Sequence, residues 1–337
     1  MKHANHVHER RAFLKTLGIL AAGTVVAPVI RVLPAFAAET MTKTFEQRML
    51  MGTFVSMTVL APSRQLGEEA IGRSFEEIER QIAIFSRFDS STALSTLNQH
   101  GYLSGAPREL LEVVDFSSTL FNRSSGRFDV TVAPLVNLLE RTHGKPDAAD
   151  LREALSLVDG AKIRQSGSNL RFDTPGMSAT LDGVAKGYIA DSAAKALTDA
   201  GVTHFLIDAG GDIRVGGCSD GLNRAWRVAI EDPDKKGNYP AIIELRDGAV
   251  ATSGGYEVFF DSSKKSHHLV DPASGVSPQY VTSVSVQAPT VKEADGLATA
   301  LSLMTPREAL RLTQSLTNHA CLLVTSSGAR LTSSNWG

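Results

Sequence analysis

Residues 181–208 read LDGVAKGYIADSAAKALTDAGVTHFLID, and this stretch decides how we expect the chain to fold. It predicts a helix from Val184 to Ala200, which the helix-breaking Gly201 ends. The apolar run from Phe205 to Asp208 then predicts a short strand. A helix that leads directly into a strand indicates a chain that mixes α and β elements. The elements on either side of this stretch then decide the fold class.

Toward the N-terminus, the same mixture of elements continues. Phe54 to Leu60 predicts a strand, and Gly67 to Phe85 predicts a helix with one buried face. Pro107 to Asn122 predicts a second helix, since proline suits a first helical turn. Short strands at 161–163 and 170–172 are expected to flank a Ser-Gly-Ser-Asn turn.

Toward the C-terminus, residues 226–286 are expected to be rich in strands, with turns at 236–238 and 247–248. The last expected elements are helices at 291–304 and 306–316 and a strand at 321–325. No regular βαβ rhythm appears anywhere in the chain. We therefore predict an α+β fold, with mixed or antiparallel sheets and packed helices.

The first 37 residues have the pattern of an export signal. Arg10 and Arg11 precede an uncharged stretch from Thr16 to Ile30, and residues 35–37 read Ala-Phe-Ala, a small-x-small cleavage site. This pattern predicts a twin-arginine-type signal peptide at 1–37 and one domain at 38–337. The alternative is a membrane anchor, but a spanning helix needs about 20 apolar residues. The apolar run is shorter and contains Pro28, so we expect a periplasmic or otherwise exported protein, soluble after cleavage.

Composition excludes some partners. The whole chain carries a formal net charge of −2, and residues 1–37 hold five Lys or Arg and one Glu, so the remainder carries about −6. This acidic balance gives no electrostatic reason to bind nucleic acid. The two cysteines are Cys218 and Cys321. Export would allow them to pair, but Cys321 lies in an apolar run that favours a buried free thiol.

Several short patterns suggest a ligand site. Asp295 and Thr299 are four residues apart in an expected helix, so they share a face and offer two hard oxygens suited to Mg²⁺. Lys186 follows the Asp182-Gly183 turn at a helix start, where backbone N–H groups favour a phosphate. The alternatives are a helix cap or solvated face for the first pair, and a loop glycine with a surface lysine for the second.

Other patterns are equally open between a site and ordinary structure. The turns at Gly210-Gly211 and Ser253-Gly254 allow backbone to approach a ligand, or are only turns. A strand that carries His267-His268 would place one imidazole for proton transfer, since neighbouring strand residues face opposite ways. Residues 126–135 contain an aromatic ring and a carboxylate that suit a flat ligand, but a buried strand with a polar edge explains them as well.

Taken together and in order, these motifs resemble those of the ApbE family over almost the whole of residues 38–337. The motifs are Met51-Gly52-Thr53, Phe85-Ser86-Arg87-Phe88-Asp89, Leu94-Ser95-Thr96-Leu97-Asn98, Gly126-Arg127-Phe128-Asp129, Ala185-Lys186-Gly187-Tyr188, Gly210-Gly211-Asp212, Ala251-Thr252-Ser253-Gly254, His268 with Asp271-Pro272, and Ala294-Asp295 with Ala298-Thr299.

The resemblance implies a T-fold-like core and a Mg²⁺-dependent FAD:protein FMN transferase. Such enzymes cleave the FAD pyrophosphate, transfer FMN to a Thr or Ser hydroxyl of an exported protein, and release AMP. By motif position, the resemblance implies Mg²⁺ ligands at Asp295, Thr299 and the Gly183 carbonyl, and makes His268 the candidate base. The FAD-binding residues that it implies are Met51, Phe88, Arg127, Phe128, Asp129, Lys186, Gly210, Gly211, Ser253, Gly254 and Leu269.

The resemblance also implies an acceptor protein, a membrane or periplasmic electron-transfer subunit that carries an Asp-x-x-(Ser/Thr)-Gly-Ala-Thr-like motif. Three other functions stay open. An FAD pyrophosphatase would release FMN and AMP to water from the same metal site, and an exported flavin-binding protein would need no catalytic residues. An FAD-dependent oxidoreductase would need a dinucleotide fingerprint, which the glycine spacing does not provide. The oligomeric state is not predicted.

Overall fold

The computed structural model describes residues 41–234 and 237–337. The predicted signal peptide at 1–37 and Lys236 of one predicted turn lie outside these residues. Within the described ranges, every helix is too short or too polar to cross a membrane. Both cysteines are buried there as free thiols, as the run around Cys321 predicted.

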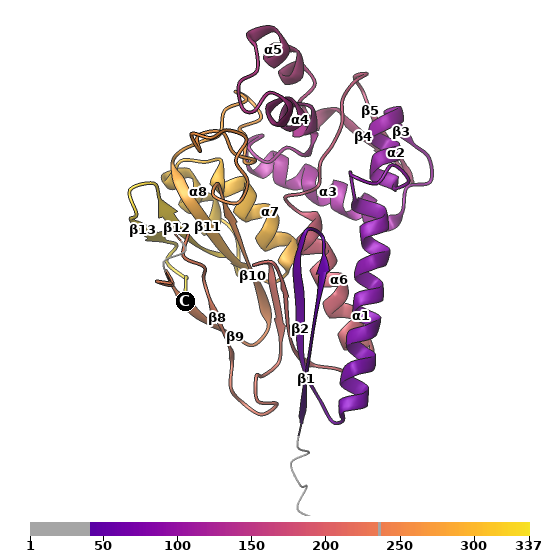
Figure 1. Cartoon of the computed structure of the whole chain (residues 1–337), viewed down its shortest axis with the longest axis vertical. Helices are drawn as coiled ribbons and strands as arrows, with labels where there is room; N and C mark the ends of the chain where they lie inside the picture. The colour runs from indigo at the N-terminus through magenta and orange to yellow at the C-terminus, as the bar shows by residue number, and fades with distance from the viewer. Residues whose placement is uncertain (1–40, 235–236) are drawn as a thin grey trace, which may run out of the picture. The chain divides into compact units, whose positions relative to one another are not determined.

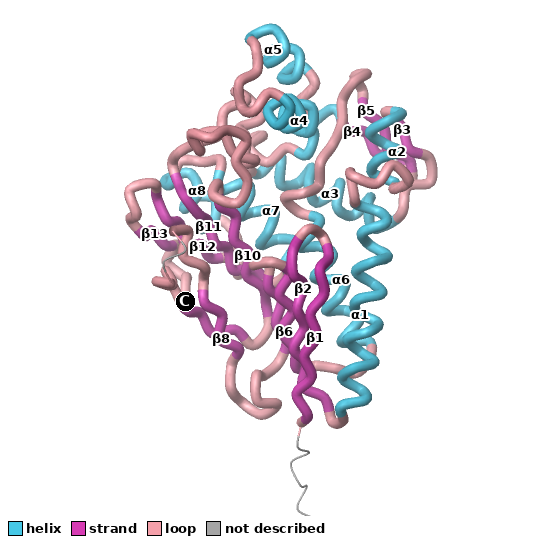
Figure 2. Tube along the Cα trace, viewed as in Figure 1, coloured by secondary structure: helices cyan, strands magenta, loops and turns pink. Residues whose placement is uncertain are grey.

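An eight-stranded antiparallel sheet forms the centre of the fold (Figure 2). The strand order is β1-β2-β6-β7-β10-β11-β12-β13. The strands are β1 (Thr42–Leu50), β2 (Thr53–Ala61), β6 (His204–Ala209), β7 (Ile213–Gly216), β10 (Gly248–Gly254), β11 (Val281–Ala288), β12 (Ala320–Thr325) and β13 (Arg330–Thr332). The predicted α+β class is therefore confirmed.

Helices pack on one face of this sheet and bury its core. Along β2, alternate residues Val55, Met57 and Val59 are fully buried, as expected where one strand face meets helices. The packed helices are α1 (Arg64–Phe85), α6 (Ala185–Asp199), α7 (Val291–Ser302) and α8 (Pro306–Gln314). Figure 1 shows α6 and α7 side by side behind the β1–β2 hairpin.

Smaller elements complete the fold around this core. The hairpin of β8 (Trp226–Ala229) and β9 (Ile242–Leu245) buries Val228 and Ile243 against Val250 and Leu322 of the main sheet. A three-stranded sheet joins β3 (Tyr102–Leu103), β5 (Asn169–Phe172) and β4 (Ile163–Ser166). The remaining helical elements are α2 (Ala93–His100), α3 (Arg108–Arg123), η1 (Val130–Val132), α4 (Ala133–Arg141), α5 (Ala148–Ser156) and η2 (Gly160–Lys162).

One sequence prediction about local structure is wrong, and another holds only in part. The strand expected at 161–163 is largely the 3₁₀ turn η2, because the Asp159 side chain accepts a hydrogen bond from the Ala161 N–H and starts a helical turn. The region 226–286, expected to be rich in strands, contains β8, β9, β10 and most of β11, and irregular backbone separates β10 from β11. The ladder there is reduced to one isolated bridge between Phe259 and His267.

Candidate functional site

The site is built where α6 crosses α7. The Gly187 N–H on α6 donates to Asp295 Oδ2 on α7 over 3.0 Å. Gly187 has to be glycine, because a Cβ atom there would lie 2.5 Å from the Val291 carbonyl oxygen. The close approach of the two backbones therefore fixes Asp295 beside the first turn of α6.

A second contact between the same segments gathers oxygen atoms. Thr299 Oγ1 lies 3.5 Å from the Gly183 carbonyl oxygen and 3.4 Å from Ser253 Oγ at the end of β10. A Cβ atom on Gly183 would lie 2.9 to 3.3 Å from side-chain atoms of Thr299, so glycine permits this approach. These long oxygen–oxygen contacts leave Thr299 weakly hydrogen-bonded and available to another partner.

The Asp295 carboxyl is held in an environment that opposes its charge. Only 4% of the residue is exposed, and burial, followed by the Asp212 carboxylate, raises the pKa of Asp295 to about 8. A bound divalent cation would reverse this effect. With the Thr299 hydroxyl and Gly183 carbonyl, the donor set fits Mg²⁺, which takes few protein ligands and completes its shell with water or phosphate oxygens. No cluster of three His, Cys, Asp or Glu side chains suited to a metal occurs in the described ranges.

Lys186 supplies a fixed positive charge next to these oxygens. Its Nζ lies 2.9 Å from Asp212 Oδ2, and Asp212 is only 2% exposed. The Asp212 carboxylate raises the pKa of Lys186, which is therefore protonated at neutral pH. Burial raises the pKa of Asp212, and the ammonium opposes this. The Lys186 side chain is 36% exposed, so the ammonium can also contact a ligand that enters from solvent.

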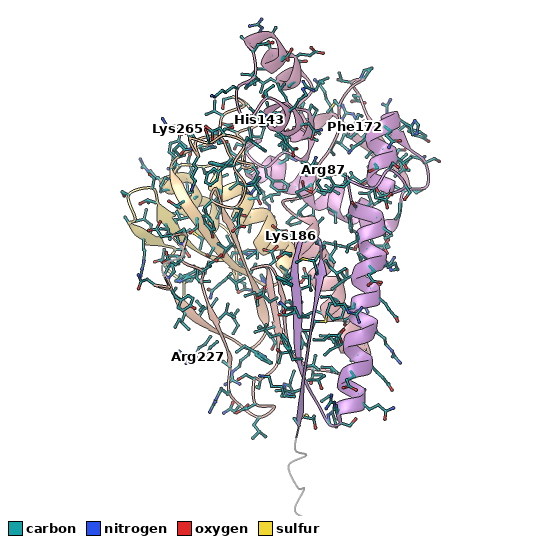
Figure 3. The ribbon with its side chains drawn as sticks, viewed as in Figure 1. Arg87, His143, Phe172, Lys186, Arg227 and Lys265 are labelled. Carbon is teal, nitrogen blue, oxygen red and sulfur yellow. The ribbon has the colours of Figure 1, made fainter. Side chains whose placement is uncertain are left out.

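Two hairpin turns lie at the same edge of the sheet as Lys186. The β2–β6 register pairs Val55 with Ala209, so the Met51-Gly52 turn lies next to Gly210-Gly211. Both residues of each turn have positive φ: 53° and 74° in the first, 71° and 94° in the second. Such two-residue turns usually carry Gly, Asn or Asp, so Met51 is a strained exception. Figure 3 shows Lys186 near the tip of the β1–β2 hairpin, with Arg87 above it.

The two adjacent histidines have different surroundings, although they do not lie in the strand on which their predicted alternation rested. His268 Nδ1 lies 3.4 Å from the Val258 carbonyl oxygen, and burial, followed by the Lys186 ammonium, lowers the pKa of His268. His267 is 6% exposed, and its Nε2 lies 3.2 Å from the Pro278 carbonyl oxygen. His268 is therefore the one that senses Lys186, although it lies in irregular backbone and not in the expected strand.

Arg87 forms the rim of the site. It pairs with Asp182 at 2.9 Å, donates to Asn137 Oδ1 at 3.0 Å, and lies 4.5 Å from the ring centre of Phe88. Phe88 is 80% exposed, so its ring is open to solvent at this rim. The site thus combines a deep acidic and cationic part with an exposed aromatic ring.

Some of the FAD-site residues implied by the resemblance have buried or engaged side chains. Phe128 is 3% exposed in the main core, and Asp129 accepts hydrogen bonds from the Thr131 and Gly160 N–H groups. The segment is a 3₁₀ turn that leads into α4, so the alternative of a buried strand is wrong. Arg127 pairs with Asp271 at 2.6 Å. Leu269 and Gly254 are buried. A direct FAD contact by these residues stays a prediction.

Sequence reasoning assigned no role to Asp212, Asp182 or Arg87, although Asp212 and Arg87 lie within the quoted motifs and Asp182 lies in the turn before Lys186. Only the side-chain contacts reveal that Asp212 holds Lys186 and that Arg87 holds Asp182. Two hollows lie away from this site: an open one of 610 Å³ between α1, α3 and α6, and one of 110 Å³ beside Asp129. Neither is lined by Lys186 or Asp295, so the site is identified by its side-chain contacts and not by either hollow.

Comparisons with known proteins place the chain among flavin transferases. The model of the ApbE family matches residues 51–323. An FAD:protein FMN transferase from Vibrio cholerae is 34% identical over 266 residues, which cover 74% of this chain and 77% of that protein. One from Klebsiella pneumoniae is 29% identical over 287 residues, covering 81% and 82%. The solved flavin transferase ApbE from Vibrio cholerae matches with a TM-score of 0.74 at 28% identity, over 87% of this chain and 98% of that one.

Proposed function

We propose a function from one premise: this chain belongs to the ApbE family. The chain is an FAD:protein FMN transferase, with FAD as the substrate and a protein as the acceptor. Beyond this, we propose a Mg²⁺-dependent reaction in which a Thr or Ser hydroxyl of the acceptor receives FMN and AMP leaves. The observation that carries the proposal is the buried Asp295 carboxyl, held beside Thr299, the Gly183 carbonyl and the Lys186 ammonium.

Asp295, Thr299 and the Gly183 carbonyl would hold Mg²⁺. When bound, the ion neutralises charge on the pyrophosphate and polarises its phosphoryl oxygens. The α7 backbone and the glycines at 183 and 187 orient these ligands, because both glycines allow backbone approaches that a side chain would block. The high pKa of Asp295 supports this role, since a carboxyl that disfavours charge on its own gains most from a bound cation.

Lys186 would bind the pyrophosphate from the open side. Asp212 holds its ammonium in place, so the positive charge is fixed before the substrate arrives. The exposed Phe88 ring and the strained Met51 turn lie at the rim, where a flat isoalloxazine ring could stack. These contacts would orient FAD with its pyrophosphate toward α6 and α7.

His268 would accept the proton of the acceptor hydroxyl. Its Nδ1 faces a carbonyl, which can only accept, so Nδ1 carries the hydrogen and Nε2 offers a lone pair. The lowered pKa keeps this imidazole neutral at pH 7. In the reaction, the hydroxyl oxygen forms a bond to the phosphorus of the FMN half, and the bond from that phosphorus to the bridging oxygen breaks. AMP leaves with that oxygen, and the hydroxyl proton goes to His268.

We also propose that the protein is exported and that its acceptor carries an Asp-x-x-(Ser/Thr)-Gly-Ala-Thr-like motif. Export rests on the sequence of residues 1–37 alone. The acceptor motif rests on the resemblance of the chain to its family. An exported enzyme of this kind would act on an exported or membrane-bound electron-transfer protein.

The test mixes the purified protein with FAD, Mg²⁺ and an acceptor that bears this motif, and looks for flavin fluorescence on a denaturing gel. We expect a fluorescent acceptor band that EDTA abolishes, with one AMP released per labelled acceptor. An acceptor whose motif Thr or Ser is replaced by alanine is the matched control and should stay dark. FMN and AMP in solution without a labelled acceptor would favour the pyrophosphatase. FAD that stays intact would leave only flavin binding.

A further inference from the structure

The N-terminus of α7 is capped partly by a residue of another helix. An α-helix begins with four N–H groups that lack partners within the helix. In α7, the Thr290 side chain takes one of them, because it accepts from the Glu293 N–H at 3.2 Å. Two more go to Asp191 on α6. Its Oδ1 accepts from the Val291 N–H at 3.0 Å, and its Oδ2 from the Lys292 N–H at 2.9 Å.

This cap lies one helical turn from the contact that holds Asp295. On α6, Asp191 follows Gly187 by four residues, and on α7, Asp295 follows Val291 by four residues. Asp191 accepts from the first turn of α7, and Gly187 donates to Asp295. The two helices are therefore joined at two points one turn apart, with hydrogen bonds in opposite directions. Such a pair of contacts prevents α7 from sliding along α6, because a slide would break both.

Within the described ranges Asp191 forms one ion pair, and the Lys292 ammonium also favours its negative charge. Arg214 Nε lies 3.7 Å from Asp191 Oδ1, but Arg214 also donates to the Val215 and Gly248 carbonyls at 2.9 and 2.7 Å. Arg214 is thus held by backbone without Asp191. The main partners of the Asp191 carboxylate are the two N–H groups of α7, where the helix dipole also favours a negative charge.

We propose that Asp191 is a positioning residue that sets the place of Asp295 and Thr299 relative to Lys186 and Gly183. This inference rests on the proposed Mg²⁺ site. Asp191 touches neither substrate nor metal. It fixes α7, which carries Asp295 and Thr299, to α6, whose first turn carries Lys186. Loss of this contact loosens the ligand geometry, so it weakens metal binding more than FAD binding.

The test compares Asp191→Asn with Asp199→Asn, a matched control on the same helix. Asp199 is exposed and pairs with Lys195 one turn away, so its loss leaves the site untouched. Asparagine at 191 keeps the shape but offers one acceptor oxygen and turns an NH₂ toward an N–H donor. We expect a ten- to hundredfold weaker Mn²⁺ affinity, roughly the usual effect of a residue that supports metal ligands. Electron paramagnetic resonance of Mn²⁺ on the FAD-free protein measures it.

A second variant acts from the other helix. Val291→Pro removes one donor to Asp191 and keeps the carboxylate. Proline is tolerated at a first helical position, and Thr290 is already extended (ψ 154°), as a residue before proline requires. We expect an intermediate loss of Mn²⁺ affinity. In transfer assays, both variants should need more Mg²⁺ for half-maximal rate and keep the wild-type KM for FAD.

The proposal is overturned if Asp191→Asn unfolds at a lower temperature but binds Mn²⁺ with wild-type affinity, because the residue would then be only structural. A raised KM for FAD at unchanged metal affinity would overturn it too. Failure of the proposed metal site looks different: the wild-type protein itself would bind no Mn²⁺, or Asp295→Ala would bind as well as wild type. That result would also remove the role of Asp191.

Discussion

Replacing Asp295 with asparagine should abolish metal-dependent transfer and stabilise the metal-free protein. The structure raises the pKa of this carboxyl from 3.8 to about 8. Between these two pH values the folded protein keeps a proton that the unfolded chain has released, so stability falls as pH rises through this window. The pH rises by about three units from 3.8 to 7, and each unit is worth about 1.36 kcal/mol. The folded protein therefore loses up to about 4 kcal/mol of stability by pH 7.

Asparagine removes this cost because it resembles the protonated acid and can still accept the Gly187 N–H. The free energy of unfolding of Asp295→Asn, measured in urea with EDTA, should exceed that of wild type at pH 7 and the difference should shrink toward pH 4. Asp199→Asn, an exposed carboxylate on α6, should show no such trend. In the fluorescence assay, Asp295→Asn should lose at least about a hundredfold in rate, since the ion is worth several kcal/mol in the transition state.

The reasoning is refuted if metal-free Asp295→Asn is less stable than wild type at pH 7 to 8. The carboxylate would then be stabilised by its protein surroundings, and no bound cation would be needed to explain its burial. A stable variant that still transfers FMN at the wild-type rate would refute the assignment of Asp295 as a metal ligand.

Three further predictions concern neighbouring residues. Wild-type kcat should fall at acid pH, below the ordinary histidine pKa of 6.5, because burial lowers the pKa of His268. His268→Gln should remove this fall, and a pH–rate profile of the variant that still falls at acid pH would exclude His268 as the base. Lys186→Met should destabilise the protein by about 3 kcal/mol in urea, since it leaves the buried Asp212 unpaired, whereas Lys195→Met should cost less than about 1 kcal/mol. Met51→Gly should stabilise the protein by about 1 kcal/mol, because φ at Met51 is 53°, and should weaken FAD binding in a fluorescence titration; tighter binding would show that the strained Met51 turn does not contact FAD.

The sequence predicted α1, α3, α6, α7 and α8 because each carries a local signal, whereas α2, α4 and α5 were not predicted. Apolar spacing marks α1, Pro107 precedes α3, and Gly201 follows α6. The irregular segment between β10 and β11 could not be predicted in this way. Its conformation depends on side-chain contacts that no local pattern reveals, such as the ion pair of Asp271 with the distant Arg127 and the Ser277 hydroxyl that accepts from the His267 N–H.

Part of the candidate site could likewise be predicted from local sequence, and part depends on tertiary packing. Asp295 and Thr299 share a helical face, which follows from a spacing of four residues. That Gly183 and Gly187 bring α6 and α7 together follows only from tertiary packing, since each glycine avoids a clash with a residue more than a hundred positions away. The pairing of Lys186 with Asp212, and of Asp191 with the start of α7, likewise joins elements that no local pattern connects.

The most direct test of the account is a crystal structure of the protein with FAD and Mn²⁺, read by the anomalous signal of the metal. We predict a peak within about 2.2 Å of an Asp295 carboxylate oxygen, Thr299 Oγ1 and the Gly183 carbonyl oxygen, with the FAD pyrophosphate between the metal and Lys186. A metal peak away from these three oxygens, or a pyrophosphate bound out of reach of Lys186, would contradict the assignment of this site.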